Sequence, residues 1–271
     1  MPIFLFVHPM EVHLSERVER ERRAHTDDDV LARSYALKDR FAHIWTFPSR
    51  LRLFGLMDEY ARDLRGKTVL DYGCGRGEAS LKYLKAGADK VVGIDISSEY
   101  IAEALRTAEA AGFDSARFDF RAMDAHRLDF PDASFDLVIG YGILHHLDAD
   151  VALAEIHRAL KPGGRVLLQE PLADHPLLKL FRRLTPNART EDEAPFSGAE
   201  IKRLTERPEW RTELAYCGIL EAPVAMLTSV LMPDRPQNAL LRLADRIERW
   251  LHRQGLWSNW NQYVLFNMRK A

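Results

Sequence analysis

The segment Val69-Leu-Asp-Tyr-Gly-Cys-Gly-Arg-Gly-Glu78 decides the fold of this chain of 271 residues. It begins with an apolar run that ends at Asp71, which is typical of a buried strand, and three glycines follow at alternate positions. Glycines let the backbone turn sharply and approach a ligand closely because they carry no Cβ. The segment therefore predicts a strand, then a tight turn able to hold a ligand, then a helix.

Strands and helices alternate on both sides of this turn. Besides the strand over 67–71, short apolar runs predict strands over 90–94, 116–121, 135–139 and 164–169. Helical patterns separate them, at 78–85, at 99–111 and before Pro162. Strands that alternate with helices of this length form βαβ units, so we expect a parallel sheet with right-handed crossovers.

Helical patterns also flank this central region. Residues up to about 65 are expected to form helices, one of them over 51–63, and residues 262–268 resemble a strand that returns to the sheet. Near the C-terminus an amphipathic helix is predicted, with arginines on one face: Arg242, Arg246, Arg249 and Arg253. Its apolar stripe consists of Leu240, Leu241, Leu243, Ala244, Ile247, Trp250 and Leu251. We interpret the stripe as buried and the arginines as solvated, with docking on a membrane surface as the alternative.

The composition is that of an ordinary soluble globular protein, with 46% hydrophobic and 29% charged residues. The net charge is −2, so no global positive field exists to attract nucleic acid. Two cysteines are too few for a disulfide framework, which favours a reducing cytoplasm. The apolar opening has no basic n-region, and no apolar run approaches the roughly 18 residues of a transmembrane helix.

Three carboxylates follow three successive strands. Asp71 ends the first strand, Asp95 ends the second, 18 residues after Gly77, and Asp124 follows the third. Open α/β sheets bind ligands at the carboxyl ends of their strands, so we expect these side chains to meet there. Asp95 is placed to accept hydrogen bonds from two ribose hydroxyls, and Asp124 could accept one from an adenine amino group. The plainer interpretation is that Asp71 and Asp124 cap helices or turns.

These blocks, followed by Phe135-Asp-Leu-Val-Ile-Gly-Tyr-Gly-Ile-Leu-His-His-Leu147 and Leu160-Lys-Pro-Gly-Gly-Arg-Val-Leu-Leu168, resemble class I S-adenosylmethionine-dependent methyltransferases. The resemblance is to the small-molecule group that includes quinone and natural-product enzymes. It covers roughly residues 66–170, about two fifths of the chain.

The resemblance implies an α/β fold with a Rossmann-like, seven-stranded and mostly parallel sheet. Its strand order is 3-2-1-4-5-7-6, with strand 7 antiparallel and formed by 262–268. We expect four segments: a helical cap over 1–65, the cofactor-binding core over 66–171, a substrate-side or lid segment over 172–260, and the closing strand over 261–271.

The resemblance also implies a site for S-adenosylmethionine. In it, Asp71 and the turn glycines line the methionine and ribose side, Asp95 binds the ribose, and Asp124 binds the adenine amino group. Two apolar side chains enclose adenine, and two residues after strand four lie beside the methyl donor. The full set is Asp71, Gly73, Gly75, Asp95, Ile96, Met123, Asp124, Ala125, Gly140 and Tyr141. No metal is expected.

Candidates for a general base are His145, His146 and Glu170, although one histidine could be structural and Glu170 could bond backbone. Tyr35, His43 and Trp45 are candidates for contact with the acceptor. We expect a small, largely apolar or aromatic acceptor enclosed by the helical additions, which could also join two copies of the chain. The atom that receives the methyl group is left open among oxygen, nitrogen and carbon.

Other functions are compatible with parts of the pattern. A protein of this fold could bind the cofactor without transferring its methyl group, or use it for a rearrangement. A nicotinamide oxidoreductase is disfavoured by the glycine spacing and by Asp71, which would repel a pyrophosphate. A methyltransferase acting on nucleic acid is disfavoured because residues 66–171 carry 12 basic and 17 acidic side chains.

Overall fold

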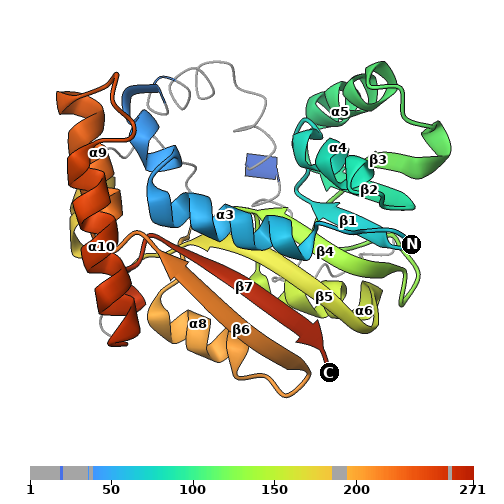
Figure 1. Ribbon diagram of the computed structural model, residues 1–271. Helices are drawn as coiled ribbons and strands as arrows, with labels where there is room; N and C mark the ends of the chain where they lie inside the picture. The colour runs from blue at the N-terminus through green and yellow to red at the C-terminus, as the bar shows by residue number, and fades with distance from the viewer. Residues whose placement is uncertain (1–18, 21–35, 37–38, 185–193, 256–257) are drawn as a thin grey trace, which may run out of the picture.

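The computed structural model describes residues 19–20, 36, 39–184, 194–255 and 258–271. They form one seven-stranded sheet in the order β3-β2-β1-β4-β5-β7-β6 (Figure 1). The strands are β1 (Thr68–Tyr72), β2 (Lys90–Asp95), β3 (Phe118–Ala122), β4 (Phe135–Tyr141), β5 (Leu160–Pro171), β6 (Trp210–Cys217) and β7 (Tyr263–Lys270). Strands β1 to β5 are parallel, and β7 runs antiparallel to both β5 and β6. The predicted strand order and antiparallel strand 7 are confirmed.

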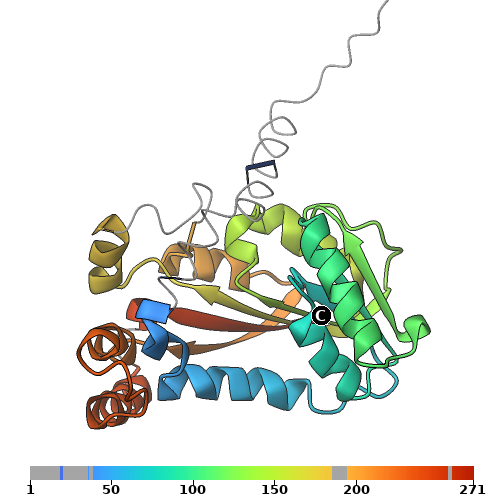
Figure 2. The same ribbon diagram turned by 90° about the horizontal axis from the view of Figure 1, so that it is seen from above.

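Helices cover both faces of the sheet, as the view from above shows (Figure 2). One face carries α3 (Pro48–Tyr60), α4 (Glu78–Lys85) and α5 (Ser98–Ala110), and the other carries α6 (Ala149–Ala159) and α8 (Gly198–Thr205). Alternate residues of a strand enter opposite apolar clusters, so Val69 packs with the first group of helices and Leu70 with the second. The sheet is therefore buried on both faces, as expected for parallel strands.

Three further helices lie beyond the carboxyl ends of β5 and β6: α7 (Pro176–Leu184), α9 (Glu221–Leu231) and α10 (Ala239–Arg253). Short 3-10 turns complete the structure: η1 (Ala42–Trp45), η2 (Ser115–Arg117), η3 (Leu144–His146) and η5 (Ser258–Trp260). In the part of the chain that the structure describes, no helix has both the length and the apolar character needed to cross a bilayer.

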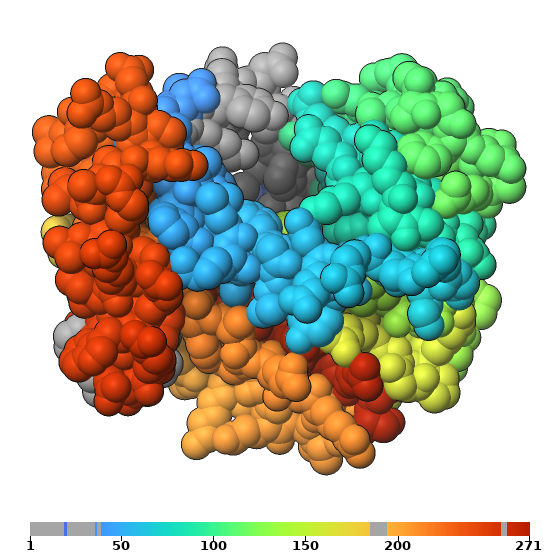
Figure 3. All heavy atoms as spheres, viewed as in Figure 1, coloured from blue at the N-terminus to red at the C-terminus, as the bar shows by residue number. Residues whose placement is uncertain are grey.

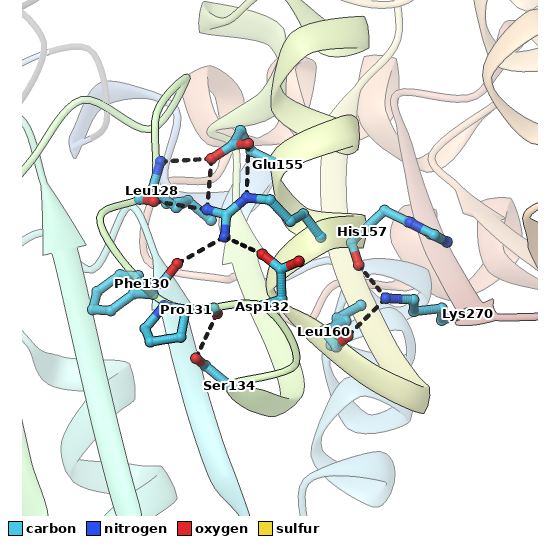
Figure 4. A network of polar contacts seen from close by, with 10 residues as sticks. Leu128, Phe130, Pro131, Asp132, Ser134, Glu155, His157, Leu160 and Lys270 are labelled. Atoms are coloured by element: carbon cyan, nitrogen blue, oxygen red, sulfur yellow. Dashed lines mark hydrogen bonds and ion pairs between the residues drawn. The ribbon is translucent and has the colours of Figure 1, made fainter.

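The loop between β3 and β4 is fastened to α6 by Arg158 and by Glu155, which accepts from the N–H of Leu128 at 3.0 Å; most of the bonds come from Arg158 (Figure 4). Its guanidinium donates to the carbonyl oxygens of Leu128 at 2.8 Å and Phe130 at 2.7 Å, and it pairs with Glu155 and Asp132, both at 2.9 Å. Five donors in a planar fork allow one arginine to make this many bonds. The loop after Asp124 is thereby held against the core.

Strand β6 lies within the segment 172–260, where we expected no particular strand. The charged Arg211 and Glu213 lie along it, and only its end residues, Trp210 and Cys217, are buried, because β6 is an edge strand. An edge strand buries less surface than a central one, so the apolar signal is weak.

The predicted burial of the α10 stripe is wrong for four of its members, Leu240, Leu243, Ile247 and Trp250, which are exposed. The buried face instead includes two acids, Asp245 and Glu248. Glu248 accepts hydrogen bonds from the N–H groups of Gly218 at 2.7 Å, Leu220 at 2.9 Å and Glu221 at 3.1 Å. These bonds to the start of α9 hold Glu248 on the inward face, beside the buried Leu241 and Leu251, and leave the other four apolar side chains facing outward.

Candidate active site

The carboxyl ends of the parallel strands bring the predicted acids to one edge of the sheet. Asp71 lies near the end of β1, Asp95 ends β2, and Asp124 follows β3 by two residues. The registers place Asp71 opposite Gly93 and Asp95 opposite Ala122. The three carboxylates thus follow three neighbouring strands along a single edge.

The glycine turn after β1 is tied to the end of β2. The N–H groups of Gly73 and Cys74 donate to the carbonyl oxygen of Ile94 at 3.0 and 2.8 Å, and the N–H of Gly75 donates to Asp95 Oδ2 at 2.9 Å. Gly73 has a φ of 76°, and a Cβ there would meet Ile143 at 3.0 Å. A residue with a side chain is strongly disfavoured at Gly73, and the turn and the β2 end form one rigid unit.

Asp71 is a buried carboxyl group held by one hydroxyl. Its Oδ2 accepts a hydrogen bond of 2.5 Å from Ser80 Oγ, and only 2% of the residue is exposed. Burial raises the pKa of Asp71 to about 7, more than the Ser80 bond lowers it. A positively charged ligand at this edge would favour the ionised form.

Asp124 is kept ionised by His126. The Nε2 of His126 accepts from the N–H of Asp148 at 2.9 Å, so the ring proton sits on Nδ1, which donates to Asp124 Oδ1 at 2.8 Å. Burial alone would raise the pKa of Asp124, but the hydrogen bonds from the side chain and backbone of His126 outweigh burial and lower it. Asp124 is therefore a charged acceptor.

The remaining predicted cofactor residues surround these acids. Asp95 also accepts from the N–H of Ser97 at 3.0 Å, so both of its oxygens are positioned. Ala125 is buried, and its carbonyl accepts from Tyr72 Oη at 2.6 Å. Gly140 is needed for packing, because a Cβ there would meet Leu168 at 2.8 Å. Three more side chains are partly buried along this edge: Ile96, Met123 and Tyr141.

The three base candidates lie together, but Glu170 has a structural role. Its carboxylate is fully buried and accepts from the N–H groups of Ile143, Leu144 and His145 at 2.9–3.3 Å. It also bonds His145 Nδ1 at 2.7 Å. The His146 ring centroid lies 4.1 Å from that of His145. Because Glu170 has no exposed atom, it cannot make the predicted contact with substrate in this structure. It instead orients His145.

The acceptor candidates are not brought together. Tyr35 lies outside the described residues. His43 is fully buried, with Nδ1 at 2.9 Å from Thr228 Oγ1 and Nε2 at 3.1 Å from the carbonyl oxygen of Pro233. Both ring nitrogens are therefore used to anchor η1 to α9, which leaves none for an acceptor. Trp45 is partly exposed and packs against an arginine that the sequence analysis did not single out.

That arginine, Arg50 on α3, is 5% exposed and lies in an aromatic cage. Its guanidinium carbon is 4.0 Å from the ring centroid of Tyr263, 4.6 Å from Trp45 and 5.1 Å from Phe54. Its Nε and Nη1 are buried and have no hydrogen-bond partner among the described residues. An arginine in a helix is ordinarily solvated, so no signal in the sequence could have found it.

The cage lies beside the edge that carries the acids. Tyr263 pairs with Pro171 at the carboxyl end of β5, and the ring of Phe54 is 5.9 Å from that of Tyr141 at the end of β4. The aromatic wall therefore connects Arg50 to the end of β4. Among the described residues, no group of three histidine, cysteine or acidic side chains could hold a metal ion.

Comparison with known proteins identifies the central region. Residues 69–164 match the family model of a methyltransferase domain. The 27-O-demethylrifamycin SV methyltransferase of Amycolatopsis mediterranei is 39% identical over 104 residues, which are 38% of each chain. The demethylmenaquinone methyltransferase of Thermus thermophilus is 34% identical over 134 residues, 49% of this chain and 60% of that one. The matches thus span less than two thirds of the length of these relatives.

Solved structures agree on the fold over most of the chain. A geranyl diphosphate C-methyltransferase from Streptomyces coelicolor, solved with S-adenosylhomocysteine, aligns with a TM-score of 0.60 at 16% identity, over 82% of this chain and 77% of that one. The [4+2]-cyclase SpnF aligns with a TM-score of 0.55 at 23% identity, over 81% and 80%. Residues 69–164 therefore match a methyltransferase domain, and they lie in a sheet with the strand order 3-2-1-4-5-7-6.

Proposed function

We propose that this chain transfers a methyl group from S-adenosylmethionine to a small, largely apolar or aromatic acceptor. The observation that carries the proposal is the row of three carboxylates, Asp71, Asp95 and Asp124, at one edge of the sheet beside the glycine turn. They lie within the residues that match the methyltransferase domain. The activity and the acceptor of the whole chain are our inference.

Open space and negative charge at this edge support the proposed cofactor site. A Cβ at Gly75, which has a φ of 51°, would meet nothing within 4 Å, so the turn leaves open space beside its backbone. In our proposal Asp71 lies at the charged methionine end, Asp95 binds the ribose hydroxyls, and Asp124 accepts from the adenine amino group. The other contacts would come from Gly73, Ile96, Met123, Ala125, Gly140 and Tyr141.

S-adenosylmethionine supplies a methyl group bonded to a sulfonium sulfur, and an in-line displacement would transfer it to the acceptor with S-adenosylhomocysteine as the leaving group. The chain's task is to align the acceptor and to exclude water from the apolar wall. We assign His145 as the base: Glu170 fixes a proton on Nδ1, so Nε2 is the nitrogen that takes a proton from the acceptor. His146 lies against that ring and would help to orient it.

Arg50 supports an acceptor with an electron-rich oxygen. The Nε and Nη1 donors of Arg50 have no partner among the described residues, which is unfavourable. In our proposal the cage opens to admit an acceptor oxygen, which would satisfy them. The surrounding rings of Trp45, Phe54 and Tyr263 suit an aromatic or apolar body. We therefore propose an acceptor that combines such a body with a carboxylate, enolate or carbonyl oxygen.

Replacing Arg50 by methionine tests this assignment. Because charged hydrogen bonds contribute roughly 1.5–3 kcal/mol, we expect Arg50→Met to raise the KM for the acceptor about 10- to 100-fold. The affinity for S-adenosylhomocysteine should stay the same. Arg62→Met, at an exposed position just after α3, is the matched control. An unchanged KM in Arg50→Met would refute the role of Arg50 without affecting the proposed cofactor site.

Methyl transfer itself is tested by incubating the chain with S-adenosylmethionine and a panel of hydroxyquinones and phenolic polyketides. We expect release of S-adenosylhomocysteine together with a product heavier by one methyl group, measured by mass spectrometry. Consumption of an acceptor without change of mass would instead support a rearrangement, the class named by the cyclase structure. Absence of any binding of S-adenosylhomocysteine would refute both functions.

We also place the protein in the cytoplasm. Cys74 and Cys217 are both free and buried, which is compatible with a reducing compartment. Burial raises the pKa of both thiols, so they are poor nucleophiles.

A further inference from the structure

We propose that α7, α9 and α10 form a docking surface for an anionic lipid bilayer. Of the 13 large apolar side chains that are exposed in the described part of the chain, ten lie on these three helices. They are Leu177, Leu180, Leu184, Leu227, Val230, Leu231, Leu240, Leu243, Ile247 and Trp250. Contiguous exposed apolar patches mark sites of interaction, whereas scattered ones do not.

The three helices lie at one end of the molecule. Helix α7 follows the carboxyl end of β5 and α9 follows that of β6. His175, just before α7, bonds the carbonyl oxygen of Ile219, just before α9, at 2.7 Å through Nε2. Figures 1 and 2 place α9 and α10 side by side at the left, and Figure 2 shows α7 at the same end but apart from them. In Figure 3 no other described segment covers the viewed side of α9 and α10.

Two of these helices divide their surface in the same way. On α10 the exposed residues Leu240, Leu243, Ile247 and Trp250 recur at intervals of three and four, so they form one stripe. Four arginines occupy the sector beside it: Arg242, Arg246, Arg249 and Arg253. On α7 the exposed leucines have the same spacing, and Lys179 and Arg183 flank them. An apolar stripe bordered by basic side chains is the pattern of a helix that lies in a membrane interface.

Within the three helices, every exposed charged side chain is basic. The acidic residues within the three helices are Glu221, Asp245 and Glu248, and all three are buried. In the described part of the chain Arg242, Arg246 and Arg253 are in no ion pair, whereas Arg249 pairs with Asp245 at 3.0 Å. The complete chain has a net charge of −2, so this end differs in sign from the molecule as a whole.

Charge and shape favour a bilayer over other occupants. Two copies facing each other through this surface would bring arginines against arginines, which is unfavourable in the low dielectric of an interface. The apolar side chains are spread over three helices at a protruding end of the molecule, and a deformable bilayer can receive them all. Anionic headgroups would pair with the arginines, and the leucines and Trp250 would enter the acyl boundary.

Docking in this way would bring the carboxyl ends of β5 and β6 near the membrane, because α7 and α9 begin within a few residues of them. An apolar acceptor could then pass from the bilayer to the aromatic cage. The inference rests on exposure and charge alone and holds whether or not the chain transfers methyl groups.

Vesicle flotation of the full chain tests the proposal. We expect flotation with vesicles of phosphatidylcholine and phosphatidylglycerol, little with phosphatidylcholine alone, and loss at high salt. Leu243→Glu with Ile247→Glu should reduce the bound fraction at least about tenfold. Arg242→Gln with Arg246→Gln should weaken binding about 30-fold, given the typical contribution of each basic residue near an anionic surface.

Leu51→Glu is the matched control, because Leu51 is an exposed leucine on α3, outside this surface. It should float like the unmodified chain. Equal circular dichroism and equal affinity for S-adenosylhomocysteine would show that all variants are folded. The proposal is overturned if the unmodified chain does not float or if the Leu243 and Ile247 variant floats equally well. It is also overturned if light scattering shows a dimer that this variant converts to monomers.

Discussion

Asp95 is the residue whose removal tests the proposed cofactor site most directly. Its two oxygens already accept from Gly75 and Ser97, which fixes the carboxylate at the end of β2. Because bonds to a charged acceptor contribute roughly 1.5–3 kcal/mol, Asp95→Ala should weaken binding of S-adenosylhomocysteine about 10- to 100-fold in titration calorimetry.

The control is Asp89→Ala at the other end of β2. Asp89 also accepts from a backbone N–H, that of Gly66 at 2.9 Å, but lies at the amino edge of the sheet. Asp89→Ala should leave the affinity for S-adenosylhomocysteine unchanged. If Asp95→Ala also leaves it unchanged, the ribose does not bind at this carboxylate.

Glu170 acts through His145 and is therefore a positioning residue. Glu170→Gln keeps the volume and an oxygen for the N–H of Leu144 but loses the charge beside His145 Nδ1. We expect kcat to fall about 10²- to 10⁴-fold, the usual contribution of general base catalysis, while binding of S-adenosylhomocysteine is unchanged.

His145→Gln is the companion variant. We expect its kcat to fall by a similar factor, because both changes disable the same pair, Glu170 and His145. A normal kcat in both variants would mean that the acceptor is methylated without a base. A loss in Glu170→Gln alone, accompanied by weaker cofactor binding, would show that Glu170 acts only by fixing η3.

Among the elements, those with local sequence signals were predicted and those set by long-range contacts were not. Strands β1, β2 and β4 are continuous apolar runs beside glycines and proline, so the sequence marks them clearly. The positions of Asp71, Asp95 and Asp124 could be predicted because open α/β sheets bind ligands at the carboxyl ends of their strands. The burial of Glu248 on α10 depends on N–H groups 27–30 residues away. The cage around Arg50 likewise joins α3 to β7, a contact that no local pattern encodes.

Glu221 links three helices and gives the protein a predictable response to pH. It lies at the start of α9, accepts from the N–H of Ser49 on α3 at 2.8 Å and lies near Glu248 and Asp245 of α10. Burial, reinforced by these acids, raises the pKa of Glu221 from 4.5 to about 8. The folded state thus retains a proton that the unfolded state releases, so this group lowers stability as pH rises from about 4.5 to about 8.

Glu221→Gln should remove that contribution. We expect the variant to match the original chain near pH 5 and to exceed it near pH 8.5 by on the order of 1–3 kcal/mol in urea unfolding. Glu59→Gln, at an exposed position on α3, is the control and should follow the original chain at both pH values. If the Glu221→Gln curve is parallel to the original one, Glu221 is ionised in the folded protein.

Over the whole molecule, charge and function separate along the sheet. Residues 66–171 carry more acidic than basic side chains, 17 against 12, and the proposed cofactor acids are among them. Within α7, α9 and α10 the exposed charged side chains are all basic. In our two proposals, the acidic region faces a cationic cofactor and the basic helices face an anionic surface.

The molecule should nevertheless unfold as one unit, although its additions account for most of its length. Strand β7 lies between β5 and β6, so the last residues of the chain join the core to the segment that precedes them. All five tryptophans lie outside residues 66–171, so their fluorescence reports on the segments before and after that region, whereas the proposed cofactor site lies within it. We expect tryptophan fluorescence and far-ultraviolet circular dichroism to show one shared urea transition.

S-adenosylhomocysteine at about 100 times its Kd should raise the free energy of unfolding measured by both signals by about 2.7 kcal/mol, because a ligand stabilises the whole cooperative unit to which it binds. In Asp95→Ala the same ligand concentration should have a much smaller effect on both. A fluorescence transition that the ligand does not move would show that the additions unfold separately from the core.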